Sequence, residues 1–225
     1  VVLSWSGGKD SALALHALRQ GGAYEVVALL TTVSEEYQRI SHHGVRVALL
    51  EQQAEAIGVP LHKLMLPSGD AGPCTNEQYE GVMKEAMLGY LERGITHVAF
   101  GDLFLEDLRR YREDRLAQVG MKAVFPLWKR DTAALGREFI DAGFEAYLSC
   151  IDGRRLDETF VGRRYDRALL RDLPEEVDPC GENGEFHSFV CDGPIFRQRV
   201  PVTVSQRVKR DERYFVEMLP EGVEV

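Results

Sequence analysis

A run of small and charged residues, Ser6-Gly7-Gly8-Lys9-Asp10-Ser11, directly follows an apolar segment and opens a segment with helical periodicity. Adjacent glycines let backbone N–H groups converge on an anion, and a helix N-terminus adds positive potential. Lys9 would oppose the helix dipole unless an anion lies nearby. These residues therefore predict a phosphate-binding loop. The alternative is a tight strand-to-helix turn in which Asp10 and Ser11 serve only as polar residues of the helix start.

The spacing in this loop excludes two common phosphate-binding motifs. The pattern G-x-x-x-x-G-K-[ST] is absent, because Asp10 follows the lysine where that motif needs Ser or Thr. The pattern G-x-G-x-x-G is absent too. A different class of phosphate loop is therefore expected.

The elements that must position this loop alternate along the chain. Short β-rich runs alternate with helical patterns, which predicts parallel strands joined by crossover helices. The runs are 1–5, 25–33, 60–66, 97–103, 122–128 and 145–151. The clearest helix opens at Thr75, where Gln78 completes a capping box.

The period changes near residue 155. An amphipathic helix over about 155–173 is expected to lead into an acidic loop and two β-like runs, 186–190 and 200–208. We therefore expect a soft domain boundary, with one domain at 1–153 and a smaller part at 154–225.

Composition limits the class of protein. The 225 residues are 44% hydrophobic and 28% charged, which is typical of a globular protein, and the net charge of −9 disfavours nucleic-acid binding. No apolar run approaches membrane-span length and no charged leader opens the chain, so the cytoplasm is the expected location. Four cysteines without a C-x-x-C pair favour reduced thiols. A zinc site remains an alternative, with ligands Cys74, Cys180, His187 and Cys191.

The opening loop resembles the SGGxDS pyrophosphate loop of the PP-loop, or N-type, ATP pyrophosphatases. Through nearly the whole chain, the sequence resembles one branch, the diphthine–ammonia ligase-like family of adenine nucleotide α-hydrolases. The resemblance also lies in the segments 40–44, 101–103 with 112–113, 125–128, 160–163, 181–190 and 192–194. It implies an α/β fold with a doubly wound, mainly parallel five-stranded sheet and a small C-terminal α+β part.

The resemblance implies an ATP-dependent amide ligase. A substrate carboxylate would be adenylated with release of pyrophosphate, and ammonia would then form the amide as AMP leaves. The domain at 1–153 would bind ATP and the part at 154–225 would bind substrate. Phosphate binding would fall to Ser6, Gly7, Gly8, Lys9, Asp10 and Ser11, with Lys9 and Asp10 catalytic and Asp10 a Mg²⁺ ligand.

Further site residues follow from the same resemblance. Thr31, Thr32, Gly101 and Asp102 are candidates for the adenosine pocket, because ligands bind at the carboxyl ends of strands in open α/β sheets. Packing at the edge of the core is the alternative for these four. The substrate and ammonia site would comprise His43, Glu182, Glu185 and His187, with Glu185 catalytic, since ammonia needs a proton acceptor. A surface turn rich in Gly and Glu is the alternative for the acidic segment.

One departure from the family leaves the acid open. Members that make diphthamide carry Glu-Thr where this chain has His187-Ser188. We expect ATP and Mg²⁺ as cofactors, and ammonia and a carboxylate-bearing protein side chain or small molecule as partners. A homodimer is the expected assembly, with no membrane or nucleic acid. Two alternative functions are an ATP- or AMP-binding module without ligase activity and a PP-loop RNA-modifying enzyme.

Overall fold

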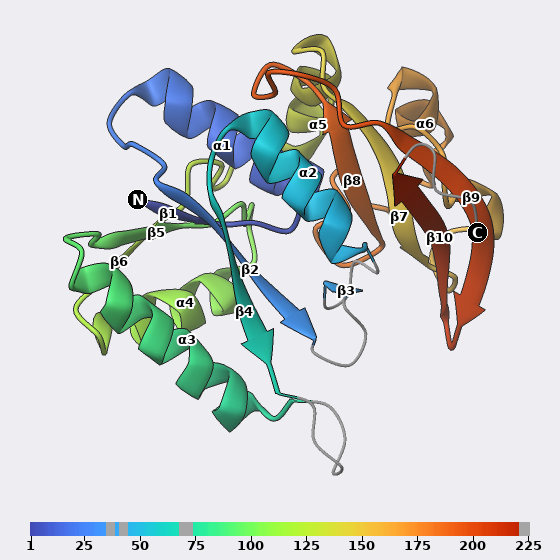
Figure 1. The fold of residues 1–225 in the computed structure, drawn as a ribbon. Coiled ribbons are helices and arrows are strands. Elements are labelled where there is room, and N and C mark those ends of the chain that lie inside the picture. Colours follow the sequence, from blue (N-terminus) through green and yellow to red (C-terminus); the bar gives the residue numbers. More distant parts are fainter. Residues whose placement is uncertain (35–38, 41–44, 68–73, 221–225) are drawn as a thin grey trace.

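The computed structural model describes residues 1–34, 39–40, 45–67 and 74–220, which form a layered α/β unit beside a second, smaller sheet (Figure 1). The elements of the first part, in chain order, are β1 (Val2–Ser4), α1 (Lys9–Gly21), β2 (Ala28–Ser34), β3 (Arg39–Ile40), α2 (Val47–Ile57), β4 (Leu61–Leu66), α3 (Asn76–Leu91), β5 (His97–Ala99), α4 (Glu106–Ala117), β6 (Lys122–Val124) and α5 (Thr132–Asp141). The remaining elements are β7 (Glu145–Asp152), the 3-10 helix η1 (Glu158–Phe160), α6 (Arg167–Asp172), β8 (Phe186–Asp192), β9 (Val202–Arg210) and β10 (Arg213–Pro220).

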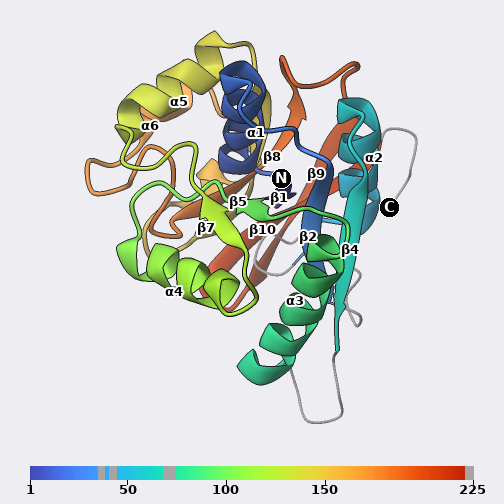
Figure 2. The ribbon, with the colours of Figure 1, turned by 90° about the vertical axis from the view of Figure 1, so that its left-hand side faces the viewer.

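The larger sheet contains five parallel strands in the order β4-β2-β1-β5-β6. The short strand β3 pairs antiparallel with the end of β2. Helices α1 and α2 cover one face of this sheet, and α3 and α4 cover the other (Figures 1 and 2). The predicted doubly wound, five-stranded α/β sheet is confirmed.

The second sheet corrects part of the expected strand rhythm. β7 was expected to continue the parallel series, but it pairs antiparallel with β8 and β10 in a sheet ordered β8-β7-β10-β9. Its second half is buried on both faces, so its sequence reads like a central parallel strand. Periodicity shows that a strand is buried but does not show which sheet it joins.

Two other expectations for the C-terminal part need correction. The single amphipathic helix expected over 155–173 is wrong, because the chain forms only η1 and α6, with extended residues between them. In that stretch Arg164 forms a β-bridge with Tyr147. β10 is a strand that the sequence pattern did not reveal. The boundary expected near residue 153 stays a prediction.

The capping box predicted at Thr75 is confirmed. Thr75 caps α3 by accepting a hydrogen bond from the Gln78 backbone, and Gln78 returns one in the predicted capping box. Gly22 and Gly58 end α1 and α2 in the left-handed conformation, which glycine adopts without a Cβ penalty. No helix among the described residues is both long enough and apolar enough to span a membrane.

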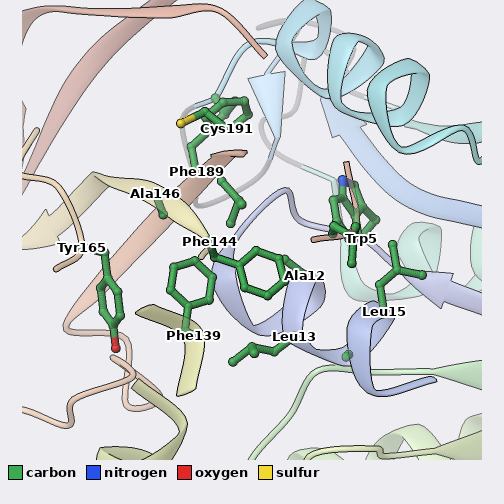
Figure 3. Close-up of a cluster of buried hydrophobic side chains, with 14 of the residues drawn as sticks. Trp5, Ala12, Leu13, Leu15, Phe139, Phe144, Ala146, Tyr165, Phe189 and Cys191 are labelled. Atoms are coloured by element: carbon green, nitrogen blue, oxygen red, sulfur yellow. The ribbon is translucent and has the colours of Figure 1, made fainter. Parts of the chain in front are cut away.

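A continuous hydrophobic core joins the two sheets through α1 (Figure 3). The rings of Phe139 and Phe144 stack with centroids 4.8 Å apart, in the same buried cluster as Ala12 and Leu13 of α1. Phe189 of β8 completes this region of the cluster. Because α1 begins at the predicted phosphate loop, this core fixes the loop against the C-terminal part.

Candidate active site

A cavity of about 570 Å³ lies where the strands β1 and β5 end and the loop before β8 approaches them. This volume falls within the range of small-molecule sites, about 300–1,000 Å³. The predicted site residues that line it are Ser6, Gly8, Lys9, Asp10, Ser11, Thr31, Thr32, Gly101, Asp102, Glu182 and His187. Residues from both parts of the chain therefore meet at one cavity.

The turn between β1 and α1 has a shape that requires glycine. Gly7 has φ +77°, and a Cβ on it would lie 2.6 Å from the Leu50 side chain. A Cβ on Gly8 would lie 3.0 Å from the Ser188 carbonyl oxygen. The Ser11 hydroxyl donates to the Gly8 carbonyl at 2.9 Å, and the Ser6 hydroxyl accepts from the Gly8 N–H at 3.2 Å. The loop is therefore a tightly bonded turn.

Strand β8 holds this loop from the C-terminal part. The Lys9 N–H donates to Ser188 Oγ at 3.1 Å, and the Val190 N–H donates to the Gly7 carbonyl at 2.9 Å. Gln53 of α2, which is fully buried, donates to the carbonyls of Gly7 and Val190 and accepts from Trp5 Nε1. The loop conformation therefore depends on the C-terminal sheet as well as on its own glycines.

Lys9 connects the loop to the acidic segment before β8. Its side chain is 2% exposed, and its ammonium contacts Asp10 Oδ1 at 2.7 Å and the Cys180 carbonyl. Burial disfavours the charged form, but the Asp10 carboxylate and the other nearby groups outweigh burial and raise the pKa of Lys9. Lys9 is therefore a charged lysine beside the cavity.

A second ion pair lies on the wall formed by the segment after β5. The guanidinium of Arg112 is 3.1 Å from Asp102 Oδ2 and lies over the Phe100 ring at 4.2 Å. Burial raises the pKa of Asp102, although Arg112 opposes that rise. Gly101 must be glycine here, because its Cβ would lie 2.8 Å from the backbone of Asp10. This side of the cavity therefore combines the Phe100 ring with the Arg112–Asp102 ion pair, whose charges neutralise each other.

Glu182 is a half-buried acid that lines this site. Its Oε1 accepts from the Leu103 N–H at 2.7 Å, so its carboxylate bridges the C-terminal loop and the segment after β5. Burial raises its pKa to about 7, and the negative charges of Asp10 and Asp102 add to that rise. A carboxylate with a pKa near neutrality is suited to accept and release a proton.

Glu185 occupies a different place from Glu182. It is buried, it does not line the cavity, and its Oε1 accepts hydrogen bonds from the Asp178 N–H and Asn183 Nδ2, each at 3.1 Å. These bonds hold the loop that carries Glu182. The catalytic role of Glu185 stays a prediction, as does the role of His187, and His43 lies outside the described residues.

The cavity has features that suit a nucleotide. Thr31 lies in β2 one residue beyond the last residue paired with β1, and its buried hydroxyl has no hydrogen-bond partner among the described residues. An unsatisfied buried hydroxyl is costly unless a ligand or water completes it. The helix N-terminus of α1 and the charged Lys9 lie at the same cavity. The residues present therefore fit a phosphate-bearing, hydrogen-bonding ligand.

Several cavity residues were not singled out from the sequence. Tyr79, Phe100 and Arg213 line the cavity, and so do Ser188 and Arg112, which lie in segments of the family resemblance but were given no role at the site. The sequence does mark Ser188, because this residue lies where the chain departs from the family pattern. Nothing in the sequence marks Arg213 as a site residue, since it lies in a strand that the pattern did not reveal.

Two family models match this chain. The model described as the diphthamide synthase N-terminal domain matches residues 1–123, and that described as the diphthamide synthase C-terminal domain matches residues 131–220.

Curated relatives agree with the models. The diphthine–ammonia ligase of Danio rerio is 27% identical over 233 residues, covering 93% of this chain and 89% of the relative. The Bos taurus and Homo sapiens proteins of the same name are 26% and 24% identical, each covering 90% of this chain and 82% of the relative. Together with the SGGKDS loop at the cavity, the match of both family models places this protein in the diphthamide synthase family.

Proposed function

We propose that this protein is an ATP-dependent amide ligase that joins ammonia to a substrate carboxylate. The observation that carries the proposal is one cavity lined by the SGGKDS loop, the segment after β5 and the segment containing Glu182 and His187. The relatives cited above are all named diphthine–ammonia ligases. A nucleotide-binding module without ligase activity and an RNA-modifying enzyme are therefore not favoured.

The reaction has two steps. In the first, a carboxylate oxygen of the acid bonds to the α-phosphorus of ATP, and the bond from that phosphorus to the bridging oxygen of pyrophosphate breaks. In the second, the ammonia nitrogen bonds to the acyl carbon, the bond from that carbon to the AMP oxygen breaks, and a proton leaves the nitrogen. AMP and the amide are the products.

The residues of this chain divide these tasks. Lys9 and the α1 N-terminus stabilise the negative charge that grows on departing pyrophosphate. Thr31 and the segment at Gly101 bind the adenosine part. Glu182, with its pKa raised to about 7, accepts the proton that leaves the ammonia nitrogen. Glu185 supports Glu182 by holding the loop.

Magnesium belongs to this proposal as the cation that neutralises phosphate charge when bound. Asp10 and Asp102, which both line the cavity, would supply carboxylate oxygens to it. In the described part of the chain no group of three or more His, Cys, Asp or Glu side chains could hold a metal, so phosphate oxygens and water would complete the coordination. A cytoplasmic location and a homodimer stay predictions from the sequence.

Diphthine is the acid we propose, on the ground of the relatives' names. The test incubates the protein with Mg-ATP, ammonium and an elongation factor that carries diphthine. We expect pyrophosphate and AMP in amounts equal to the amide, and only when the acid is present. ATP binding without acid-dependent pyrophosphate release would contradict the proposal.

A substitution in the phosphate loop tests the role of Lys9. Lys9→Ala should lower the rate of pyrophosphate release by roughly 10²–10³-fold, because one charge that stabilises the transition state is lost. An unchanged rate in a folded variant would reject the role of Lys9.

A further inference from the structure

The cavity has an uneven pairing of charged side chains. Two of its cations are neutralised, Lys9 by Asp10 and Arg112 by Asp102. Arg213 of β10 also lines the cavity and forms no ion pair with any described residue. Its Nη1 donates to the Gly184 carbonyl at 3.4 Å and approaches Cys150 Sγ at 3.9 Å, and both partners are uncharged. Arg213 is therefore a cation at the cavity that forms no ion pair within the described part of the chain.

The carboxylate of Asp152 attracts Arg213 electrostatically but forms no ion pair with it. Asp152 is paired in register with Arg213 across β7 and β10, but its carboxylate is bound by Arg154 at 2.9 Å and 2.6 Å. Glu182 accepts a hydrogen bond from the Leu103 N–H. The charge of Arg213 thus remains available to a ligand.

Arg213 lies on the face of the small sheet that meets the cavity. Cys150 is paired with His187 on one side and with Phe215 on the other, so these three residues share a face. Arg213 is two residues before Phe215 and therefore lies on the same face. His187 and Arg213 both line the cavity from the C-terminal part.

We propose that Arg213 binds the carboxylate of the acid substrate and holds it for attack on the nucleotide. This inference rests on the proposed ligase function. An acid that enters this cavity meets the carboxylate of Glu182 as well as the nucleotide phosphates, and like charges repel at these distances. A cation without a partner offsets that repulsion, and a guanidinium matches a carboxylate with two parallel hydrogen bonds. The substrate class is therefore an acid whose free carboxylate reaches the Gly184–Arg213 wall.

The test compares the wild-type protein with Arg213→Ala, Arg213→Lys and the control Arg210→Ala. Arg210 is an exposed arginine of the same hairpin that does not line the cavity. Initial rates of pyrophosphate release are measured as the concentration of the diphthine-bearing elongation factor is varied and, separately, as the concentration of Mg-ATP is varied. Calorimetry gives the Kd for Mg-ATP alone, and thermal unfolding checks that each variant is folded.

We expect Arg213→Ala to raise the KM for the acid by about 10- to 100-fold, the usual worth of a hydrogen bond to a charged group. The Kd for Mg-ATP should change by less than about twofold, and Arg210→Ala should behave as wild type. Arg213→Lys keeps the charge without the fork and should fall between wild type and Arg213→Ala. This variant decides the question if Arg213→Ala does not fold.

Two other results are distinguishable. Wild-type protein that releases no pyrophosphate with the acid refutes the ligase function, and this inference with it. Wild-type activity with an unchanged KM for the acid in Arg213→Ala, or in Arg213→Lys if the alanine variant is unfolded, overturns the role of Arg213 alone. A loss of Mg-ATP affinity as large as the loss for the acid also overturns it, because it would make Arg213 a structural residue of the whole cavity.

Discussion

Replacing Glu182 by Gln isolates the charge of one carboxylate in the cavity. Gln keeps an oxygen that can accept the hydrogen bond from the Leu103 N–H, so the loop retains its main contact. The substitution removes a carboxyl group whose pKa is raised by burial and by the charges of Asp10 and Asp102. The effect should therefore depend on pH.

The magnitude follows from the pKa of Glu182, which rises from 4.5 to about 7. At about 1.4 kcal/mol per pKa unit, the full shift corresponds to about 3 kcal/mol. Glu182 is only half-buried, so solvent screening reduces this to roughly 1–2 kcal/mol. Because the folded state holds the proton more tightly, Glu182 stabilises the protein fully below pH 4.5, and this stabilisation is lost as the pH rises to about 7.

The assay is urea unfolding of wild type and Glu182→Gln at pH 4.5, 6 and 8. The free energy of unfolding of Glu182→Gln, relative to wild type, should increase by about 1–2 kcal/mol between pH 4.5 and pH 8. Glu176→Gln, an exposed position before the same loop, controls for removal of a carboxylate. A relative stability that does not change with pH would refute the reasoning.

In activity assays, Glu182→Gln should still release pyrophosphate but form amide slowly. Glu185→Gln should destabilise the loop instead.

Two further predictions concern the contacts between the phosphate loop and its supports. Ser188→Ala removes the acceptor of the Lys9 N–H and should weaken Mg-ATP binding by about 5- to 10-fold in calorimetry, at about 1 kcal/mol for one hydrogen bond. Ser188→Thr keeps the hydroxyl and should restore binding; equal weakening in both variants would contradict the role of the hydroxyl. Gln53→Leu removes the acceptor of Trp5 Nε1 and the side-chain donor to the Gly7 and Val190 carbonyls, and it should lower the free energy of unfolding by about 3 kcal/mol, measured by urea denaturation. A loss below about 1 kcal/mol would show that those partners find other bonds.

Local signals in the sequence predicted the larger part of the fold. The five strands of the parallel sheet, the capping box at Thr75 and the glycines that end α1 and α2 depend on residues a few positions apart. The glycines of the loop between β1 and α1 are an equally local signal, although distant segments also hold the loop. Such features can be predicted because backbone preferences act over a few residues.

The C-terminal part shows where this reasoning fails. Strand β7 has the burial of a parallel strand but joins the antiparallel sheet, and β10 was not recognised at all. Two glutamates three positions apart, Glu182 and Glu185, look equivalent in the sequence. Only one of them lines the cavity, because the loop turns between them and buries the other against its own backbone.

By itself, the sequence of this protein determined an α/β fold that opens with a glycine turn suited to phosphate. The tertiary structure alone decided what completes the site. Ser188 reaches the Lys9 N–H across 179 residues, and Arg213 joins the cavity from the last strand. Contacts of this kind arise when a shared core packs distant segments together, and no periodicity within either segment encodes the position of the other.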